Sequence, residues 1–326
     1  MIKYFKFLKI AVGATLSILI AYKCNLIFAP SAGIITLLTI QDTKKETIYL
    51  VLKRMGAFLI MLFLCSIIFY VFGYQGVSFG IFIFLFILIC DVLNVQDAIA
   101  MNAVLATHFL AQGNMKASLI QNEVGLLLVG AGMGVILNLY NPRNIKDIRR
   151  SQMEIETAFK AILDRMAFYV LQVDKGNYTD DCFIPLERLI HTATKKAFEN
   201  MNNHFFADTK YFIEYMEMRK KQVDILKNIY QHILMLSGVP LQAEGIALLL
   251  KHIAESLHES NNAAALLDEL AKLKAFYKQD ELPKSRMEFE SRAVLFQILA
   301  DLEQFLRRKK EFVEQLTEKE KECYWG

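Results

Sequence analysis

Ionisable side chains inside strongly apolar segments are the residues of this chain best placed to do chemistry. Asp97 and His108 are eleven residues apart, on one helix face and about 16 Å from each other. Glu123 opens the next apolar segment, close in depth to His108. Charges in hydrocarbon are costly, and His with Glu can carry protons. The pattern predicts a polar pathway with His108 and Glu123 at the outer end and Asp91 and Asp97 at the inner end. Alternatively, the three carboxylates lie at headgroup level and only cap helices.

A basic cluster forms the second candidate. Lys44, Lys45, Lys53 and Arg54 follow one apolar segment and precede another. Such a cluster would concentrate an anionic substrate at the inner mouth of a pathway. The alternative interpretation is that these residues only anchor the chain at the cytoplasmic membrane surface.

Enzyme motifs are missing from the sequence. It has no P-loop, no GxGxxG and no HExxH, and its five cysteines are scattered without metal-ligand spacing. We therefore expect no enzyme activity, no cofactor and no metal site.

The distribution of charge indicates where these residues reside. Residues 1–142 hold nine Lys/Arg and five Asp/Glu, whereas residues 143–326 hold 28 and 29. A chain that is nearly uncharged and then densely charged passes from lipid to water. We predict a transmembrane domain over 1–142 and a water-exposed domain over 143–326.

Six apolar segments of the first domain are predicted to cross the bilayer. Their loops carry an excess of Lys and Arg on one side, eleven against two, which places both termini in the cytoplasm of a multi-pass plasma-membrane protein. Topology explains this positive charge, so no nucleic-acid partner is expected. A secretory signal peptide is the alternative for the first segment. The segments are 10–21, 24–40, 60–72, 77–90, 95–110 and 124–140.

Local signals place several helix ends. Ala29-Pro30 should open the second helix, and the Thr43 to Glu46 spacing is a capping box for the third. The turn at 73–76 should separate the third and fourth helices. Ser118 to Gln121 should cap the last helix of the domain, and Asn94 the helix that carries Asp97. Gly130 and Gly134 give this last helix a small face for helix packing or dimerisation, with pore lining as the alternative.

The second domain shows helical periodicity throughout. We predict an all-α fold in which the six-helix transmembrane domain is followed by a cytoplasmic antiparallel helical bundle. The charged runs 307–310 and 318–322 are interpreted as solvated helix faces. The predicted helices are 145–173, 184–203, 208–237, 243–257, 263–277 and 287–316.

Several segments resemble one bacterial family. Residues 31–45, 104–108, 122–123 and 138–142 are similar to the corresponding spans of the aromatic acid exporter family, although Asn141 stands where Met is expected. The resemblance implies export of aromatic carboxylates across the plasma membrane and relatedness to fusaric acid resistance proteins and plant malate channels. Larger exporters carry two membrane halves, which implies a homodimer here. The motif positions that match, without assigned roles, are Thr43, Lys44, Lys45, His108, Asn122, Glu123, Asn138 and Pro142.

Three functions fit these observations. The leading hypothesis is a secondary exporter of small organic anions in the lipid bilayer; the alternatives are an anion channel and a non-transporting scaffold or sensor that acts through its bundle. The candidate substrate pathway comprises Lys44, Lys45, Arg54, Asp97, His108, Asn122, Glu123 and Asn138.

Overall fold

The structure is a computed structural model that describes residues 2–140, 145–203 and 210–325. In these ranges every regular element is a helix, which confirms the predicted all-α fold. The chain divides into two compact units, one of residues 1–143 and 202–207 and one of residues 144–201 and 208–326. The motif positions Asn141 and Pro142 lie outside the described residues.

The helices of the first unit fall on the predicted apolar segments. Of these, α3 and α6 are long and apolar enough to cross a membrane, and α2 and α4 are shorter apolar helices. Six crossings remain a prediction. The helices are α1 (Ile2–Lys23), α2 (Pro30–Thr39), α3 (Lys44–Phe72), α4 (Gly76–Val92), α5 (Ile99–Gln112) and α6 (Ala117–Leu139), with the 3₁₀ turn η1 (Gln96–Ala98) before α5.

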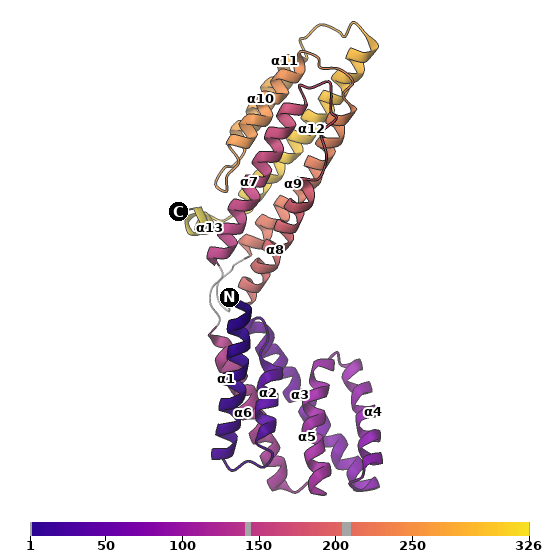
Figure 1. The fold of residues 1–326 in the computed structure, drawn as a ribbon, viewed down its shortest axis with the longest axis vertical. Helices are drawn as coiled ribbons and strands as arrows, with labels where there is room; N and C mark the ends of the chain where they lie inside the picture. The colour runs from indigo at the N-terminus through magenta and orange to yellow at the C-terminus, as the bar shows by residue number, and fades with distance from the viewer. Residues whose placement is uncertain (1, 141–144, 204–209, 326) are drawn as a thin grey trace. The chain divides into compact units, whose positions relative to one another are not determined.

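These helices form two groups. One contains α1, α2 and α6, and the other contains α3, α4 and α5 (Figure 1). Contacts of α2 with α3 and α5, and of α6 with α3, join the groups along a seam. We call this boundary the seam below, because polar side chains meet there.

Helix α2 is too short to cross a bilayer alone. Its 10 residues span about 15 Å, half of the roughly 30 Å hydrocarbon core. It begins at Pro30, as predicted, after a non-helical segment in which Asn25 and Phe28 have positive φ. Backbone groups in such a segment need partners inside the protein when they lie at membrane depth.

The predicted helix ends are partly right. The Thr43 side chain accepts a hydrogen bond from the Glu46 N–H at 3.3 Å, and Gly73, at φ 74°, ends α3. Both predictions are confirmed. The predicted caps by Ser118 and Asn94 are wrong, because α6 already begins after Lys116 and Asn94 takes a left-handed conformation before η1.

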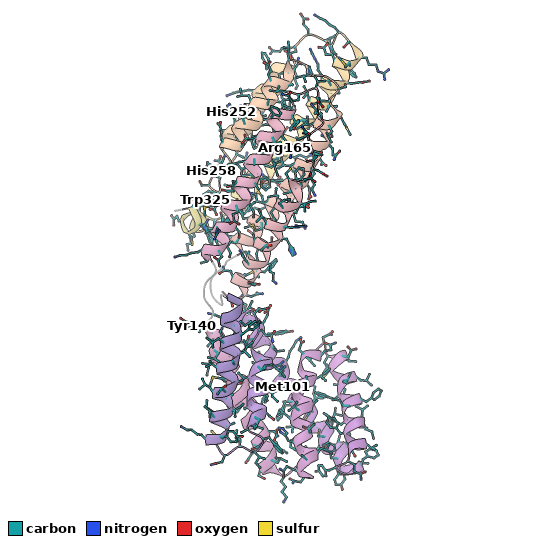
Figure 2. All side chains as sticks on the ribbon, in the orientation of Figure 1. Met101, Tyr140, Arg165, His252, His258 and Trp325 are labelled. Atoms are coloured by element: carbon teal, nitrogen blue, oxygen red, sulfur yellow. The ribbon has the colours of Figure 1, made fainter. Side chains whose placement is uncertain are left out.

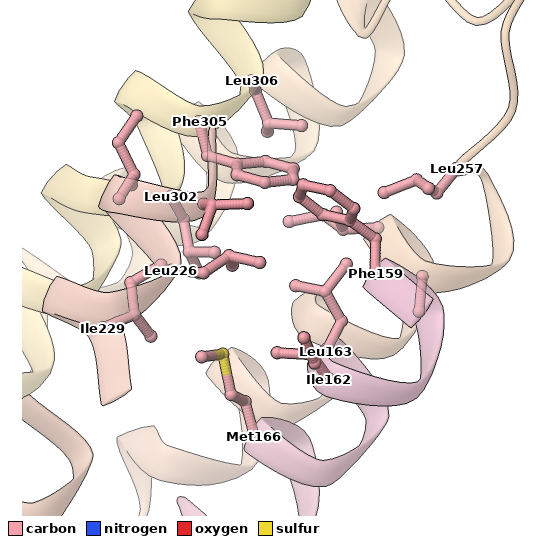
Figure 3. Close-up of a cluster of buried hydrophobic side chains, with 14 of the residues drawn as sticks. Phe159, Ile162, Leu163, Met166, Leu226, Ile229, Leu257, Leu302, Phe305 and Leu306 are labelled. Carbon is pink, nitrogen blue, oxygen red and sulfur yellow. The ribbon is translucent and has the colours of Figure 1, made fainter. Parts of the chain in front are cut away.

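The second unit is a set of amphipathic helices around one apolar core. Helix α9 packs along α12, and α7 along α10. Figure 3 shows Phe159 of α7 meeting Phe305 of α12, with ring centroids 6.2 Å apart. Each fully buried Phe or Leu of this kind stabilises the fold by about 1.5–3 kcal/mol. The helices are α7 (Ile145–Tyr169), α8 (Phe183–Asn202), α9 (Tyr211–Met235), α10 (Gln242–Glu255), α11 (Ala264–Tyr277), α12 (Arg286–Gln315) and α13 (Glu318–Trp325).

Helix α13 was not predicted as a separate element. It buries none of its residues, so its sequence has no apolar stripe. Its end is held by polar and aromatic contacts: the Trp325 indole N–H donates to the Tyr211 hydroxyl at 3.0 Å, and the Tyr324 ring stacks on Tyr211 at 4.2 Å.

Candidate functional site

A buried histidine–carboxylate pair lies in the first unit. The Nδ1 atom of His108 on α5 is 2.7 Å from Oε2 of Glu123 on α6. Glu123 is fully buried and His108 is 6% exposed. An ionised carboxylate only accepts hydrogen bonds, so Nδ1 is the donor. The structure therefore brings together the two residues that the sequence placed at one depth.

The imidazole is fixed from two further sides. Its Nε2 atom is 3.0 Å from the Ser31 hydroxyl of α2, and the Phe28 ring stacks on it at 4.1 Å and 12°. Nε2 can accept from the hydroxyl when His108 is neutral or donate to it when His108 is protonated. His108 can thus gain or lose a proton without losing its partners, which suits a proton-carrying group.

Asn122 connects this pair to the segment before α2. Its amide accepts from the Ile27 N–H at 2.7 Å and donates to the Ile27 carbonyl at 3.0 Å, so it satisfies backbone groups that no helix pairs. The same Nδ2 donates to Glu123 Oε1 at 3.0 Å. A surface hollow of about 430 Å³ includes Asn122, Ile27 and Lys116 in its lining. The buried carboxylate is therefore one side chain away from an open hollow.

Arg54 is a buried cation. It lies on α3 and is 4% exposed. Nη1 donates to the Thr39 hydroxyl at 3.2 Å, and Nε and Nη2 donate to the Asp97 carbonyl at 3.4 and 3.3 Å. Within the described residues the guanidinium forms no ion pair. Buried charges are normally paired, so an uncompensated one marks a place where an anion can bind.

The bonding capacity around Arg54 is incomplete. A guanidinium has five N–H donors, and only three are used by the described residues. Nearby, Asn102 of α5 donates to the Arg54 carbonyl at 3.4 Å, while its enclosed Oδ1 has no partner within the described part of the chain. Free donors on a guanidinium match the two oxygens of a carboxylate.

The predicted basic cluster is divided in the structure. Lys44 and Lys45 are half-buried in the first turn of α3, whereas Arg54 lies ten residues, or about 15 Å, further along the helix and points inward. Lys53 donates to the Asn94 carbonyl at 2.9 Å. One helix cannot direct neighbouring positions 53 and 54 to the same side. Only Lys44 and Lys45 remain as a pair near the helix end.

Asp97 does not join the histidine–carboxylate pair. It lies in η1 before α5, its side chain is exposed, and only its carbonyl meets Arg54. The interpretation of Asp91 as a helix-end residue agrees with its place in the last turn of α4, where Oδ1 accepts from Gln96 at 2.8 Å.

Asn138 clamps the connection between α2 and α3. Its Nδ2 donates to the Gln41 carbonyl at 3.2 Å, the Thr43 carbonyl at 3.0 Å and the Thr47 hydroxyl at 2.6 Å. Asn138 is 1% exposed. Asn122 and Asn138, both on α6, thus hold the two ends of α2.

The two glycines of α6 face α2. A Cβ at Gly130 would lie 2.6 Å from Ile35 Cβ and 2.7 Å from the Ala32 carbonyl, and one at Gly134 would lie 2.7 Å from Thr39 Cγ2. Their small face is therefore occupied by a helix of the same chain. A Cβ at Gly132 would meet nothing within 4 Å.

The seam carries polar contacts at two levels. His108 of α5 meets Ser31 of α2 and Glu123 of α6, and Arg54 of α3 meets Thr39 of α2. Each contact joins one helix group to the other. A displacement of the groups would break or remake both contacts together.

Several of these residues carry no signal in the sequence. Ser31, Phe28 and Thr39 were not singled out, and Asn102 was placed away from the site. Hydroxyls in apolar helices commonly bond the carbonyl four residues back, as Thr39 does to Ile35 at 2.6 Å. Such residues look inert until the neighbouring helix is known.

The histidines of the second unit serve separate local contacts. His252 pairs with Glu269 at 2.7 Å and His258 bonds Ser260 at 3.1 Å; both histidines are labelled in Figure 2. Over the residues described, no group of three His, Cys, Asp or Glu side chains could hold a metal ion.

Comparisons with known proteins match both units. Residues 1–141 match the family model "Aromatic acid exporter family member 1", and residues 146–310 match "Putative aromatic acid exporter C-terminal domain". The "Uncharacterized protein YqjA" of Bacillus subtilis (strain 168) is 29% identical over 308 residues, which cover 94% of this chain and 95% of that protein. A solved structure, "Crystal structure of putative membrane protein from Clostridium difficile 630", has 32% identity and a TM-score of 0.47, covering 52% of this chain and 99% of that one.

Proposed function

The chain belongs to the aromatic acid exporter family, a family of membrane exporters rather than enzymes, and on that premise we propose that it is a proton-coupled exporter of small aromatic carboxylates. The observation that carries the proposal is Arg54, a 4% exposed guanidinium with unused donors and no ion pair in the described part of the chain. In this proposal Arg54 binds the substrate carboxylate at the seam. Lys44 and Lys45 concentrate the anion on the cytoplasmic side.

The proton enters at the other level of the seam. His108 and Glu123 lie beside the hollow that Asn122 lines, which we assign to the outer face of a multi-pass protein with both termini in the cytoplasm. Proton uptake by the pair lowers the net negative charge of the His108–Glu123 site. Because Ser31 and Glu123 belong to one helix group and His108 to the other, this change alters a contact between the groups.

Movement of the two helix groups would give alternating access. The α1, α2 and α6 group is rigid because glycines and two asparagines lock α2 to α6. The α3, α4 and α5 group carries Arg54 and His108. We further propose that two copies of the chain assemble as a homodimer, which light scattering of the purified protein tests directly.

Flux in proteoliposomes tests the proposal. Purified protein is reconstituted, and movement of 4-hydroxybenzoate, benzoate and aliphatic acids is followed with and without a pH gradient. Gradient-dependent movement of an aromatic acid supports the exporter. Gradient-independent flux would instead indicate an anion channel, and no flux for any acid would favour a scaffold or sensor.

A further inference from the structure

A closed pocket in the second unit is unrelated to the seam. It lies between the start of α10, the end of α11 and the first half of α12, and has a volume of about 150 Å³. A cavity of this size is large enough for a benzene ring. The residues that line it are Gln242, Lys274, Tyr277, Lys278, Asp280, Arg292, Leu295, Phe296 and Leu299.

The pocket has an apolar body. Leu295 and Leu299 are buried, and the Tyr277 and Phe296 rings add aromatic surface. Tyr277 is held in place because its hydroxyl donates to the Gln242 carbonyl at 2.6 Å. It packs over Gly245, where a Cβ would collide with the hydroxyl oxygen. The wall is therefore built by a specific close approach, and it suits a flat apolar ligand.

Two enclosed polar atoms of the lining have no partner within the described residues. They are Nε of Arg292 and Oε1 of Gln242. Gln242 is 9% exposed, and its Nε2 donates to Asp280 Oδ2 at 2.7 Å, which fixes the amide with its oxygen away from that carboxylate. Arg292 is fixed as well, since Nη1 donates to the Glu281 carbonyl and Nη2 to Glu288. Unsatisfied buried groups are costly, so a ligand that supplies one acceptor and one donor would be favoured.

The charge of the lining selects the sign of the ligand. Lys274, Lys278 and Arg292 face one carboxylate, Asp280, within the lining. Lys274 pairs with Glu303 at 2.6 Å and Arg292 with Glu288, but Lys278 is exposed and forms no ion pair in the described ranges. A single carboxylate on the ligand would complement Lys278 and the free Arg292 donor.

We propose that this pocket binds an aromatic monocarboxylate that also carries a hydroxyl or amino donor. The carboxylate accepts from Arg292 Nε and lies near Lys278, the ring fills the space between Leu295, Leu299 and Tyr277, and the ligand's donor meets Gln242 Oε1. This is a second ligand site, apart from the transport pathway, and it gives the second unit the chemistry of a sensor for such acids. Only the sensor role rests on the proposed export function; the binding does not.

Calorimetric titration of the full chain in lipid nanodiscs tests the site. The chain carries Arg54→Gln, so that the proposed seam site does not contribute, and the probe is 4-hydroxybenzoate. Benzoate lacks the donor and 4-hydroxybenzyl alcohol lacks the carboxylate. We expect saturable binding of one 4-hydroxybenzoate per chain, with both analogues binding at least about tenfold more weakly, the factor for one lost hydrogen bond of about 1.4 kcal/mol.

Variants locate the binding. Arg292→Gln and Lys278→Gln should each weaken binding of 4-hydroxybenzoate, and Leu299→Phe, which fills the pocket, should abolish it. Arg286→Gln is the matched control, an exposed arginine on the same helix that pairs only with Glu290, and should bind unchanged. Lys278 is exposed, so its variant stays informative if Leu299→Phe fails to fold. No saturable heat, or equal binding in Arg292→Gln, Lys278→Gln and Arg286→Gln, overturns the site. Binding by the wild type that vanishes with Arg54→Gln alone places the ligand in the seam and also overturns it.

Discussion

Replacing Arg54 by Gln should separate anion transport from the stability of the fold. The substitution removes the charge but keeps an amide that can still donate to the Thr39 hydroxyl or the Asp97 carbonyl. If the guanidinium exists to bind a substrate carboxylate, transport should suffer. If it exists to hold α3 against α2 and η1, stability should suffer instead.

The two magnitudes can be worked from the contacts. Loss of a charge-assisted hydrogen bond to the substrate costs about 1.5–3 kcal/mol, so the KM for an aromatic acid should rise about 10- to 100-fold. In the fold, the lost donor to the Asp97 carbonyl costs about 1–3 kcal/mol. Removal of an uncompensated buried charge recovers a desolvation penalty of several kcal/mol. These terms oppose each other, so the free energy of unfolding should fall by no more than about 1 kcal/mol and can rise.

The assay measures initial rates of 4-hydroxybenzoate efflux from proteoliposomes over a range of substrate concentrations. Thermal unfolding of the same preparations gives the change in stability. Lys53→Gln is the control, because Lys53 is the adjacent cation and its ammonium only meets the Asn94 carbonyl and the Tyr49 ring. Its KM should change little.

One result would refute the reasoning about Arg54. A KM equal to that of the wild type, combined with a clear loss of thermal stability, would show that Arg54 is a structural residue. The anion site would then have to be sought elsewhere in the first unit.

Glu123→Gln keeps the size and most contacts of the side chain but cannot ionise, so a pH gradient should no longer accelerate export; retained acceleration would remove Glu123 from the coupling. Gly130→Ala places a Cβ 2.6 Å from Ile35 Cβ and should destabilise the first unit by about 1–3 kcal/mol in thermal unfolding, whereas Gly132→Ala, which meets nothing, should not; equal melting of the two would contradict the packing argument. Burial lowers the pKa of Lys309 from 10.5 to about 7. Between these values the unfolded chain binds the extra proton, so stability should rise from pH 7 to pH 9, and Lys309→Met should flatten that rise; an equally steep profile in the variant would sink this assignment.

The sequence predicted the helices well because their signals are local. Pro30 and Thr43 mark helix starts, and Gly73 marks an end, through backbone geometry that needs no distant partner. The approach of His108 to Glu123 was also foreseeable, since adjacent antiparallel spans bring residues at one depth together. Helix α13 escaped because its contacts with Tyr211 are polar and aromatic and follow no periodicity.

The direction of Arg54 could not be predicted in the same way. Its neighbours in the sequence are Lys53 and other membrane-surface residues, and only the position of α2 shows that position 54 faces Thr39. The clamps made by Asn122 and Asn138 were equally hidden. Their partners are backbone groups of segments about 95 residues away, whose irregular shape no local pattern encodes.

The contact of Gly134 with Thr39 has a consequence for how substrate preference would evolve. The Thr39 hydroxyl accepts from Arg54, and its methyl lies where a Cβ at position 134 would fall. A larger residue on α6 would therefore displace the hydroxyl and reorient the guanidinium without touching the substrate. Selection for a different acid can thus act on an apolar position one helix away, and bacterial lineages with altered resistance profiles should carry exchanges there while Arg54 itself stays unchanged.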